Sequence, residues 1–140
     1  DHTHRAHLTH NVSRKFESSF LGVTIPQNNS VMFGSLSGDK LGLWVAHGEG
    51  RFYLPEPEDH YNVIAKYNYA EYPGNPNGSD YNVAGICSKD GRHLAMMPHL
   101  ERAIFPWQQA WYPHDHIGDD VTPWIEAFVN ARKWIEKTMK

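Results

Sequence analysis

The sequence has one cysteine and no long hydrophobic run, and each absence excludes classes of protein. Cys87, alone among 140 residues, has no partner for an intramolecular disulfide or for a multi-cysteine metal cage. No apolar run approaches the roughly 20 residues that a membrane-spanning helix needs. Residues 1–5 lack the apolar centre of a signal peptide. We therefore expect a cytoplasmic protein that does not bind a membrane.

An excess of charge of one sign is also missing. The chain has 13 Lys and Arg against 16 Asp and Glu, with a formal net charge of -3. No broad basic field is available for a nucleic acid, so none is expected as a partner. What the chain does contain is 40% hydrophobic residues, enough for a core. Because no repeat, low-complexity segment or long linker divides it, residues 1–140 are expected to belong to one domain.

The hydrophobic pattern predicts a strand-rich chain. Strands are expected at residues 15–25, 40–47, 61–67 and 83–87. Residues 51–54 are predicted to return beside 40–47 as a hairpin around Gly48-Glu49-Gly50. A second hairpin is predicted between 83–87 and 93–97, around Asp90-Gly91. The turn-forming residues of 72–80 predict a shaped loop.

The C-terminal segment predicts one long helix. Thr122 is expected to cap it and Pro123 to occupy its first turn. Basic residues near its end favour the helix dipole. Its expected apolar stripe consists of Trp124, Phe128, Ala131 and Ile135.

A His99-x-Glu101 pair follows the apolar segment 93–97. An imidazole shuttles protons when a carboxylate accepts its other N–H and so fixes its tautomer. The pair is thus typical of the base and carboxylate of a catalytic triad, although an ordinary surface pair is the alternative. Cys87 lies in a predicted strand without a glycine-rich elbow after it, so we expect a packing residue rather than the nucleophile.

Several blocks of sequence extend this interpretation over nearly the whole chain. They are Asn11-Val-Ser-Arg-Lys-Phe-Glu17, Ala46-His-Gly-Glu-Gly-Arg-Phe52, Tyr72-Pro-Gly-Asn-Pro-Asn-Gly-Ser79, Met96-Met-Pro-His-Leu-Glu-Arg102 and Thr122-Pro-Trp-Ile-Glu-Ala-Phe-Val-Asn-Ala-Arg132. In order and spacing they resemble the C-terminal glutaminase domain of phosphoribosylformylglycinamidine synthases of the large single-chain type.

The resemblance implies an α/β fold, the C-terminal part of a class I glutaminase three-layer α/β sandwich, with the nucleophile segment and first strands upstream of residue 1. It implies release of ammonia from glutamine for ATP-dependent amination of formylglycinamide ribonucleotide. No cofactor is expected in this chain, because ATP and magnesium would bind elsewhere in the full enzyme. Expected partners are glutamine, the upstream part of the domain and the synthetase domain. The isolated chain is expected to be inactive and to self-associate.

The resemblance also assigns residues. His99 corresponds to the general base and acid, and Glu101 to its orienting carboxylate. Leu100 stands where the family usually has proline, which is expected to loosen the local backbone. Asn11, Ser13 and Phe16 either shape the glutamine pocket or form a strand-entry turn.

Other features have competing interpretations. His47 and Glu49 either line a route for ammonia or belong to a turn whose glycines allow close backbone approach. The aromatic residues of 105–112 are expected to pack inside the protein or between domains rather than to stack on a ligand. A non-catalytic binding module and a histidine-based metal hydrolase remain alternatives, although no metal is expected. The histidines concerned are His2, His4, His7 and His10, at what is expected to be a ragged terminus.

Overall fold

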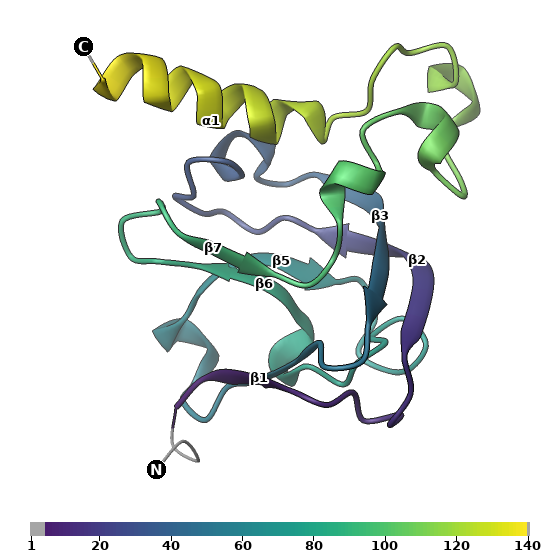
Figure 1. Ribbon diagram of the computed structural model, residues 1–140, viewed down its shortest axis with the longest axis vertical. Helices are drawn as coiled ribbons and strands as arrows, with labels where there is room; N and C mark the ends of the chain where they lie inside the picture. The colour runs from purple at the N-terminus through teal and green to yellow at the C-terminus, as the bar shows by residue number, and fades with distance from the viewer. Residues whose placement is uncertain (1–4, 140) are drawn as a thin grey trace.

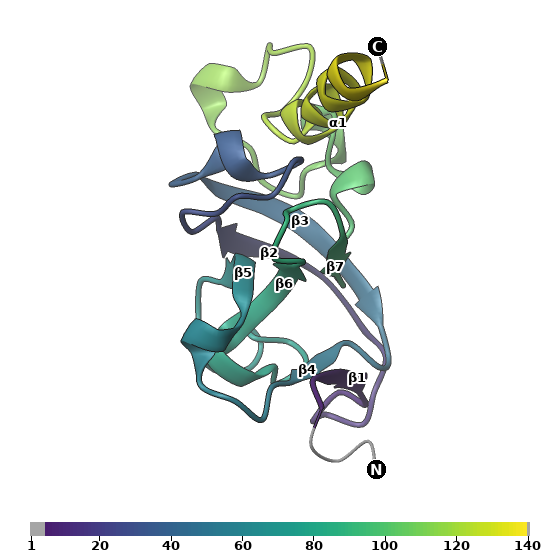
Figure 2. The ribbon, with the colours of Figure 1, turned by 90° about the vertical axis from the view of Figure 1, so that its left-hand side faces the viewer.

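The computed structural model describes residues 5–139, which form two antiparallel sheets and one α-helix. The strands and the helix are β1 (His7–Thr9), β2 (Glu17–Thr24), β3 (Lys40–His47), β4 (Arg51–Tyr53), β5 (Asn62–Tyr67), β6 (Val83–Cys87), β7 (Leu94–Met96) and α1 (Ile125–Thr138). α1 lies at the end of the molecule opposite to β1 (Figures 1 and 2).

The main sheet has five strands in the order β3-β2-β5-β6-β7, each antiparallel to its neighbours. The four predicted strands and the β6–β7 hairpin are confirmed, with Gly85 paired to Met96. After β7 the chain returns to the outer edge of β3, where His99 forms a bridge with Trp44. This return places the segment after β7 beside a strand some 50 residues earlier in the chain.

The predicted hairpin of residues 51–54 with 40–47 is wrong. β4 pairs instead with β1, Leu8 opposite Phe52, so residues expected to be a ragged terminus form a strand. Asn11 explains the change of partner. Its N–H donates to the Gly48 carbonyl (2.9 Å) and its Oδ1 accepts from the Gly50 N–H (3.0 Å), which fixes the N-terminal segment beside the turn.

The core lies between the main sheet, the 3₁₀ turn Gly34–Leu36 and α1. Alternation along β3 buries Leu43, Val45 and His47 on one face. Phe33 meets Trp124 edge to face, with ring centroids 5.9 Å apart. The buried cluster consists of Val23, Ile25, Phe33, Leu36, Leu43, Val45, Ile64, Ala65, Tyr67, Ala84, Leu100, Ala103, Trp124 and Ala127.

α1 exists where it was predicted, but its cap and its apolar stripe are wrong in detail. The Thr122 hydroxyl donates to the Ala103 carbonyl (2.6 Å) and does not cap the helix. Trp124 is buried, whereas Phe128 and Ile135 are 40% and 48% exposed. The face that α1 turns toward the core differs from the predicted one, because Ala127 is buried there and Asn130 donates to the Met32 carbonyl (3.1 Å). No helix within residues 5–139 is long and apolar enough to cross a membrane.

Candidate functional site

His99 and Glu101 are in direct contact. His99 Nδ1 lies 2.6 Å from Glu101 Oε1, and the two side chains are 31% and 57% exposed. The His99 N–H donates to the Trp44 carbonyl at 2.7 Å, so β3 fixes the backbone while Glu101 orients the ring. When a carboxylate accepts the Nδ1 proton, Nε2 is the basic nitrogen. The pair therefore has the geometry of an oriented proton-transfer group.

Leu100 explains how the backbone between them is held without proline. Its side chain is only 6% exposed and belongs to the main core. The 3₁₀ turn Leu100–Arg102 is closed by the Ala103 N–H, which donates to the Leu100 carbonyl at 3.0 Å. Burial thus restrains the backbone at this position.

Arg102 adds little to the pair. Its Nε lies 3.9 Å from Glu101 Oε1, and both side chains are 57% exposed. Exposed ion pairs of this kind typically contribute about 0–1 kcal/mol. The carboxylate of Glu101 is therefore held chiefly by His99.

His47 is a second histidine near this site, at the buried end of β3. Burial lowers its pKa, and the Coulombic effect of His99 lowers it further. Its Nε2 lies 3.4 Å from Asn77 Nδ2, while Nδ1 has no hydrogen-bond partner within the described chain. A Cβ on Gly50 would lie 2.4 Å from Nδ1, so only glycine fits there. The predicted close approach at this turn is confirmed for Gly50, whereas a Cβ on Gly48 would meet nothing within 4 Å.

A buried network of asparagines surrounds His47. Asn11 Nδ2 donates to the His47 carbonyl (2.8 Å), and Asn77 Nδ2 donates to the Gly50 carbonyl (2.8 Å). Asn77 Nδ2 also lies 3.1 Å from the hydroxyl of Tyr67, whose pKa burial raises, so this hydroxyl stays protonated. The loop 72–80 is therefore shaped, as predicted, and joined to the β3–β4 turn. The asparagines of the loop were the signal in the sequence that predicted its shape. The sequence did not indicate that their side-chain amides point inward.

Asn11, Ser13 and Phe16 have separate surroundings. Asn11 is 1% exposed and bonds only to backbone groups on three sides, which is the behaviour of a strand-entry turn. Ser13 lines a surface pocket with Tyr72, whereas Phe16 is 68% exposed beside another pocket. Neither of these pockets is lined by the His99–Glu101 pair. A role in binding glutamine stays a prediction for all three.

Cys87 has the environment of a packing residue. It ends β6, and Asn62 Nδ2 lies 3.0 Å from its sulfur. Burial raises the pKa of the thiol, and Asp90 raises it further. Nucleophilic cysteines need the opposite shift, toward the thiolate. The arrangement agrees with the prediction that Cys87 is not the nucleophile.

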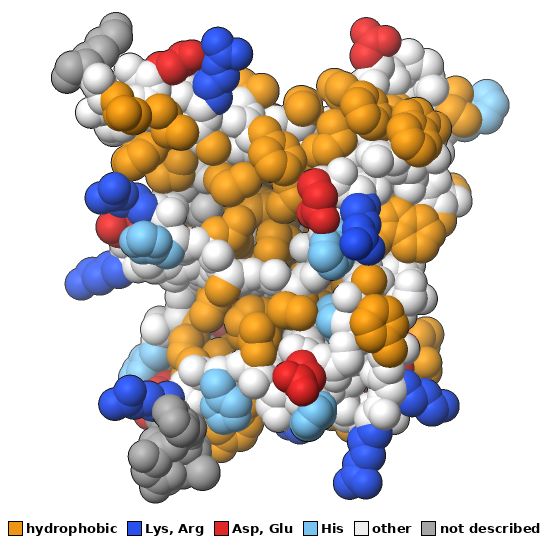
Figure 3. Space-filling model, in the orientation of Figure 1, with side chains coloured by type: hydrophobic (Ala, Val, Ile, Leu, Met, Phe, Trp, Pro, Cys, Tyr) orange, Lys and Arg blue, Asp and Glu red, His pale blue; other side chains and the backbone are white. Residues whose placement is uncertain are grey.

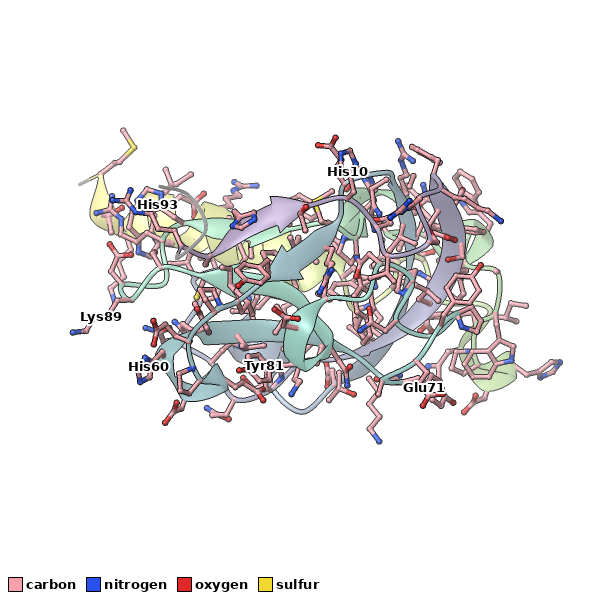
Figure 4. The ribbon with its side chains drawn as sticks, turned by 90° about the horizontal axis from the view of Figure 1, so that it is seen from below. His10, His60, Glu71, Tyr81, Lys89 and His93 are labelled. Carbon is pink, nitrogen blue, oxygen red and sulfur yellow. The ribbon has the colours of Figure 1, made fainter. Side chains whose placement is uncertain are left out.

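Within residues 5–139 the histidines do not gather around a common point. His2 and His4 lie outside the described residues, and Figure 4 shows His10, His60 and His93 at separate places on the periphery. Within residues 5–139 no three His, Cys, Asp or Glu side chains are grouped as metal ligands. His10 instead lies 3.4 Å from Glu49, both well exposed.

In the aromatic segment after the site, the backbone is anchored to the protein while two of the tryptophan rings are exposed. Trp107 and Trp111 are 80% and 72% exposed, so they do not pack inside this chain, and packing between domains stays a prediction for them. Phe105 and Trp107 stack on each other with centroids 5.8 Å apart. The backbone is fixed by the Trp44 indole, which donates to the Gln108 carbonyl at 2.7 Å.

A profile described as a CobB/CobQ-like glutamine amidotransferase domain matches residues 1–135. The chain belongs to this amidotransferase family. The amidotransferase chain is 43% identical over 148 residues to the probable phosphoribosylformylglycinamidine synthase, chloroplastic/mitochondrial, of Arabidopsis thaliana, covering 96% of this chain and 10% of the relative. It is 42% identical over 139 residues to the human phosphoribosylformylglycinamidine synthase, covering 91% of this chain and 10% of that protein.

A solved structure supports the same assignment. The amidotransferase chain superposes on a chain of PurLQS from Thermotoga maritima with a TM-score of 0.68 at 25% identity, covering 94% of this chain and 53% of that one. The expected α/β class I glutaminase fold is therefore confirmed. The amidotransferase chain spans about a tenth of the length of the curated relatives that it matches.

Proposed function

We propose that this amidotransferase domain forms part of the glutaminase portion of a phosphoribosylformylglycinamidine synthase. In such an enzyme, ammonia released from glutamine aminates formylglycinamide ribonucleotide at the expense of ATP. Relatives bearing this name match 91–97% of the chain at 36–43% identity, which supports the proposal. Its partners would be glutamine, the remaining part of the glutaminase domain and the synthetase domain. ATP and magnesium would be bound outside this chain.

The His99–Glu101 contact carries the mechanism. His99 Nε2 takes the proton of a cysteine thiol, and the thiolate attacks the glutamine carboxamide carbon. When the tetrahedral adduct collapses, His99 returns the proton to the leaving nitrogen, which departs as ammonia and leaves a thioester. Water then attacks the thioester, His99 takes its proton and returns it to the sulfur, and glutamate is released. Glu101, 2.6 Å from His99 Nδ1, keeps the ring in the tautomer that this cycle requires.

The nucleophile in this proposal comes from a protein segment outside these residues. Cys87 is the only cysteine in the sequence, and burial raises its pKa. We therefore expect the 140-residue chain by itself to release no ammonia from glutamine. Ammonia release that Cys87→Ala abolishes would contradict this.

A chimera tests the catalytic assignment. This chain would replace the matching segment of a related synthase, and activity would be measured with glutamine and with ammonium salts. We expect His99→Ala to lower the glutamine-dependent rate by about 10²–10⁴-fold, the usual contribution of a general acid–base group. The ammonia-dependent rate should be unchanged, because it bypasses glutamine hydrolysis.

His60→Ala is the matched control, since His60 is an exposed histidine on another part of the surface. Both of its rates should equal those of the parent chimera. A His99→Ala chimera that keeps full glutamine-dependent activity would contradict the proposal and favour a non-catalytic binding module.

A further inference from the structure

The outer edge of β3 is hydrogen-bonded to groups that do not belong to a neighbouring strand of the sheet. Two carbonyls of this edge are occupied and so are not open to a new strand, which would risk edge-to-edge pairing. Trp44 O accepts the His99 N–H (2.7 Å), and Gly42 O accepts the Trp124 indole N–H (2.8 Å). The segment 99–109 begins at this edge with His99 and meets Trp44 again at Gln108.

Trp44 contacts this segment at both ends. Its carbonyl binds the His99 N–H, and its indole N–H donates to the Gln108 carbonyl, each at 2.7 Å. The indole cannot swing away easily, because Phe20 packs edge-on against it with ring centroids 5.2 Å apart. The middle of the segment is held separately, by the Thr122 hydroxyl on the Ala103 carbonyl (2.6 Å).

The His99–Glu101 contact needs such support. Both side chains are partly exposed, and exposed pairs pay a cost in side-chain entropy that leaves them weak when the backbone is mobile. Catalytic groups keep a productive geometry when surrounding contacts restrain them.

We propose that Trp44 is a positioning residue for the His99–Glu101 pair. Its carbonyl fixes the backbone of His99, and its indole N–H holds the far end of the same segment, so that the imidazole is presented in one orientation. The importance of this for catalysis rests on the proposed glutaminase function, whereas the positioning itself does not.

Solvent exchange of the His99 Nδ1 proton tests the proposal directly. The 140-residue chain would be prepared with ¹⁵N-labelled histidine, and the resonance assigned by its loss in His99→Gln. We expect Trp44→Phe, which keeps a ring against Phe20 but removes the donor, to speed exchange about 2- to 10-fold. That range corresponds to one lost hydrogen bond in the opening equilibrium.

Trp107→Phe is the matched control, because Trp107 lies in the same segment but is 80% exposed. Its exchange rate should equal that of the wild type. If Trp44→Phe fails to fold, benzothienylalanine at position 44 gives an isosteric ring without the N–H. Equal exchange rates in a folded donor-deficient variant and the wild type would overturn the proposal. Faster exchange combined with a His99→Ala chimera that keeps full glutamine-dependent activity would leave Trp44 as a positioning residue and overturn only the glutaminase function.

Discussion

His47 is buried in a polar network although it can carry a charge. Its side chain lies under Gly50 and beside Asn77, with an exposed fraction of 3%. Desolvation disfavours the imidazolium, so the neutral ring is the stable form in the folded protein. Because protonation of His47 disfavours its burial at the β3–β4 turn, we expect acid to destabilise the fold through this residue.

The pH dependence of stability should therefore depend on His47. Burial lowers its folded-state pKa below the ordinary 6.5, so the unfolded chain binds the proton more tightly. The contribution of the neutral ring is complete above pH 6.5 and is lost as the pH falls below that value. We expect the free energy of unfolding, measured with urea at about pH 7.5 and about pH 5, to fall less in His47→Gln than in the wild type.

His60→Gln is the control for that experiment, since the His60 side chain is 58% exposed. Between the two pH values, the free energy of unfolding of this variant should fall as much as that of the wild type. If that of His47→Gln also falls as much, burial of His47 is not what makes the fold sensitive to acid.

At the level of single residues, the sequence predicted correctly a contact between residues that are close in the chain. A histidine and a carboxylate two positions apart are within reach of each other, and His99 and Glu101 do meet. The roles of His47 and Trp44 could not be read in the same way. Each depends on a partner far along the chain, Asn77 or Gln108, that only folding brings close.

At the scale of elements, the start of α1 is joined to the segment that carries the site. Thr122 is 2% exposed, and its hydroxyl donates to the Ala103 carbonyl rather than to the first turn of the helix. Its N–H also donates to the Ile104 carbonyl at 2.7 Å. The helix and the site segment are thus fixed to each other at this residue.

Removal of that hydroxyl should destabilise the fold. Thr122→Val keeps the shape of the side chain but leaves the buried Ala103 carbonyl with Gln109 as its remaining donor, at a cost of about 0.5–1.5 kcal/mol. Thr122→Ser, which retains the donor, should lose much less. Urea denaturation measures both, and a Val variant as stable as the Ser variant would show that the bond contributes nothing.

Strands and helices were predictable from the sequence where the hydrophobic residues recur with one dominant period. β3 and the β6–β7 hairpin follow from alternation and from turn residues. The partner of β4 did not follow, because the choice between β3 and β1 depends on Asn11 holding the turn. The face that α1 turns toward the core was missed because Asn130 faces inward to a backbone carbonyl, a contact that a hydrophobic pattern does not register.

The whole molecule exposes much apolar surface. Figure 3 shows hydrophobic side chains over the middle of one face, between the strands and α1. Phe128 and Ile135, seven positions apart on α1, are 40% and 48% exposed. Contiguous apolar surface of this kind marks interaction sites or promotes aggregation. It is consistent with a chain that covers about half of the related Thermotoga maritima chain.

We therefore expect the isolated chain to self-associate. In sedimentation velocity experiments its sedimentation coefficient should rise with concentration, because association buries the apolar face of α1. A Phe128→Lys, Ile135→Glu double variant, which leaves the net charge unchanged, should remain closer to a monomer. Lys133→Glu changes an exposed charged residue of the same helix and should behave as the wild type. A wild-type chain that stays monomeric at all concentrations would contradict this prediction.

The amino-acid pattern alone predicts a strand-rich chain, the long C-terminal helix and the proximity of His99 to Glu101. These depend on periodicity and on contacts between near neighbours, which the order of residues specifies directly. Tertiary structure decided the pairing of β1 with β4, the burial of His47 and the two contacts of Trp44 with the site segment. Each of these requires groups distant in sequence to meet and to satisfy one another's buried hydrogen bonds, a condition that local pattern does not contain.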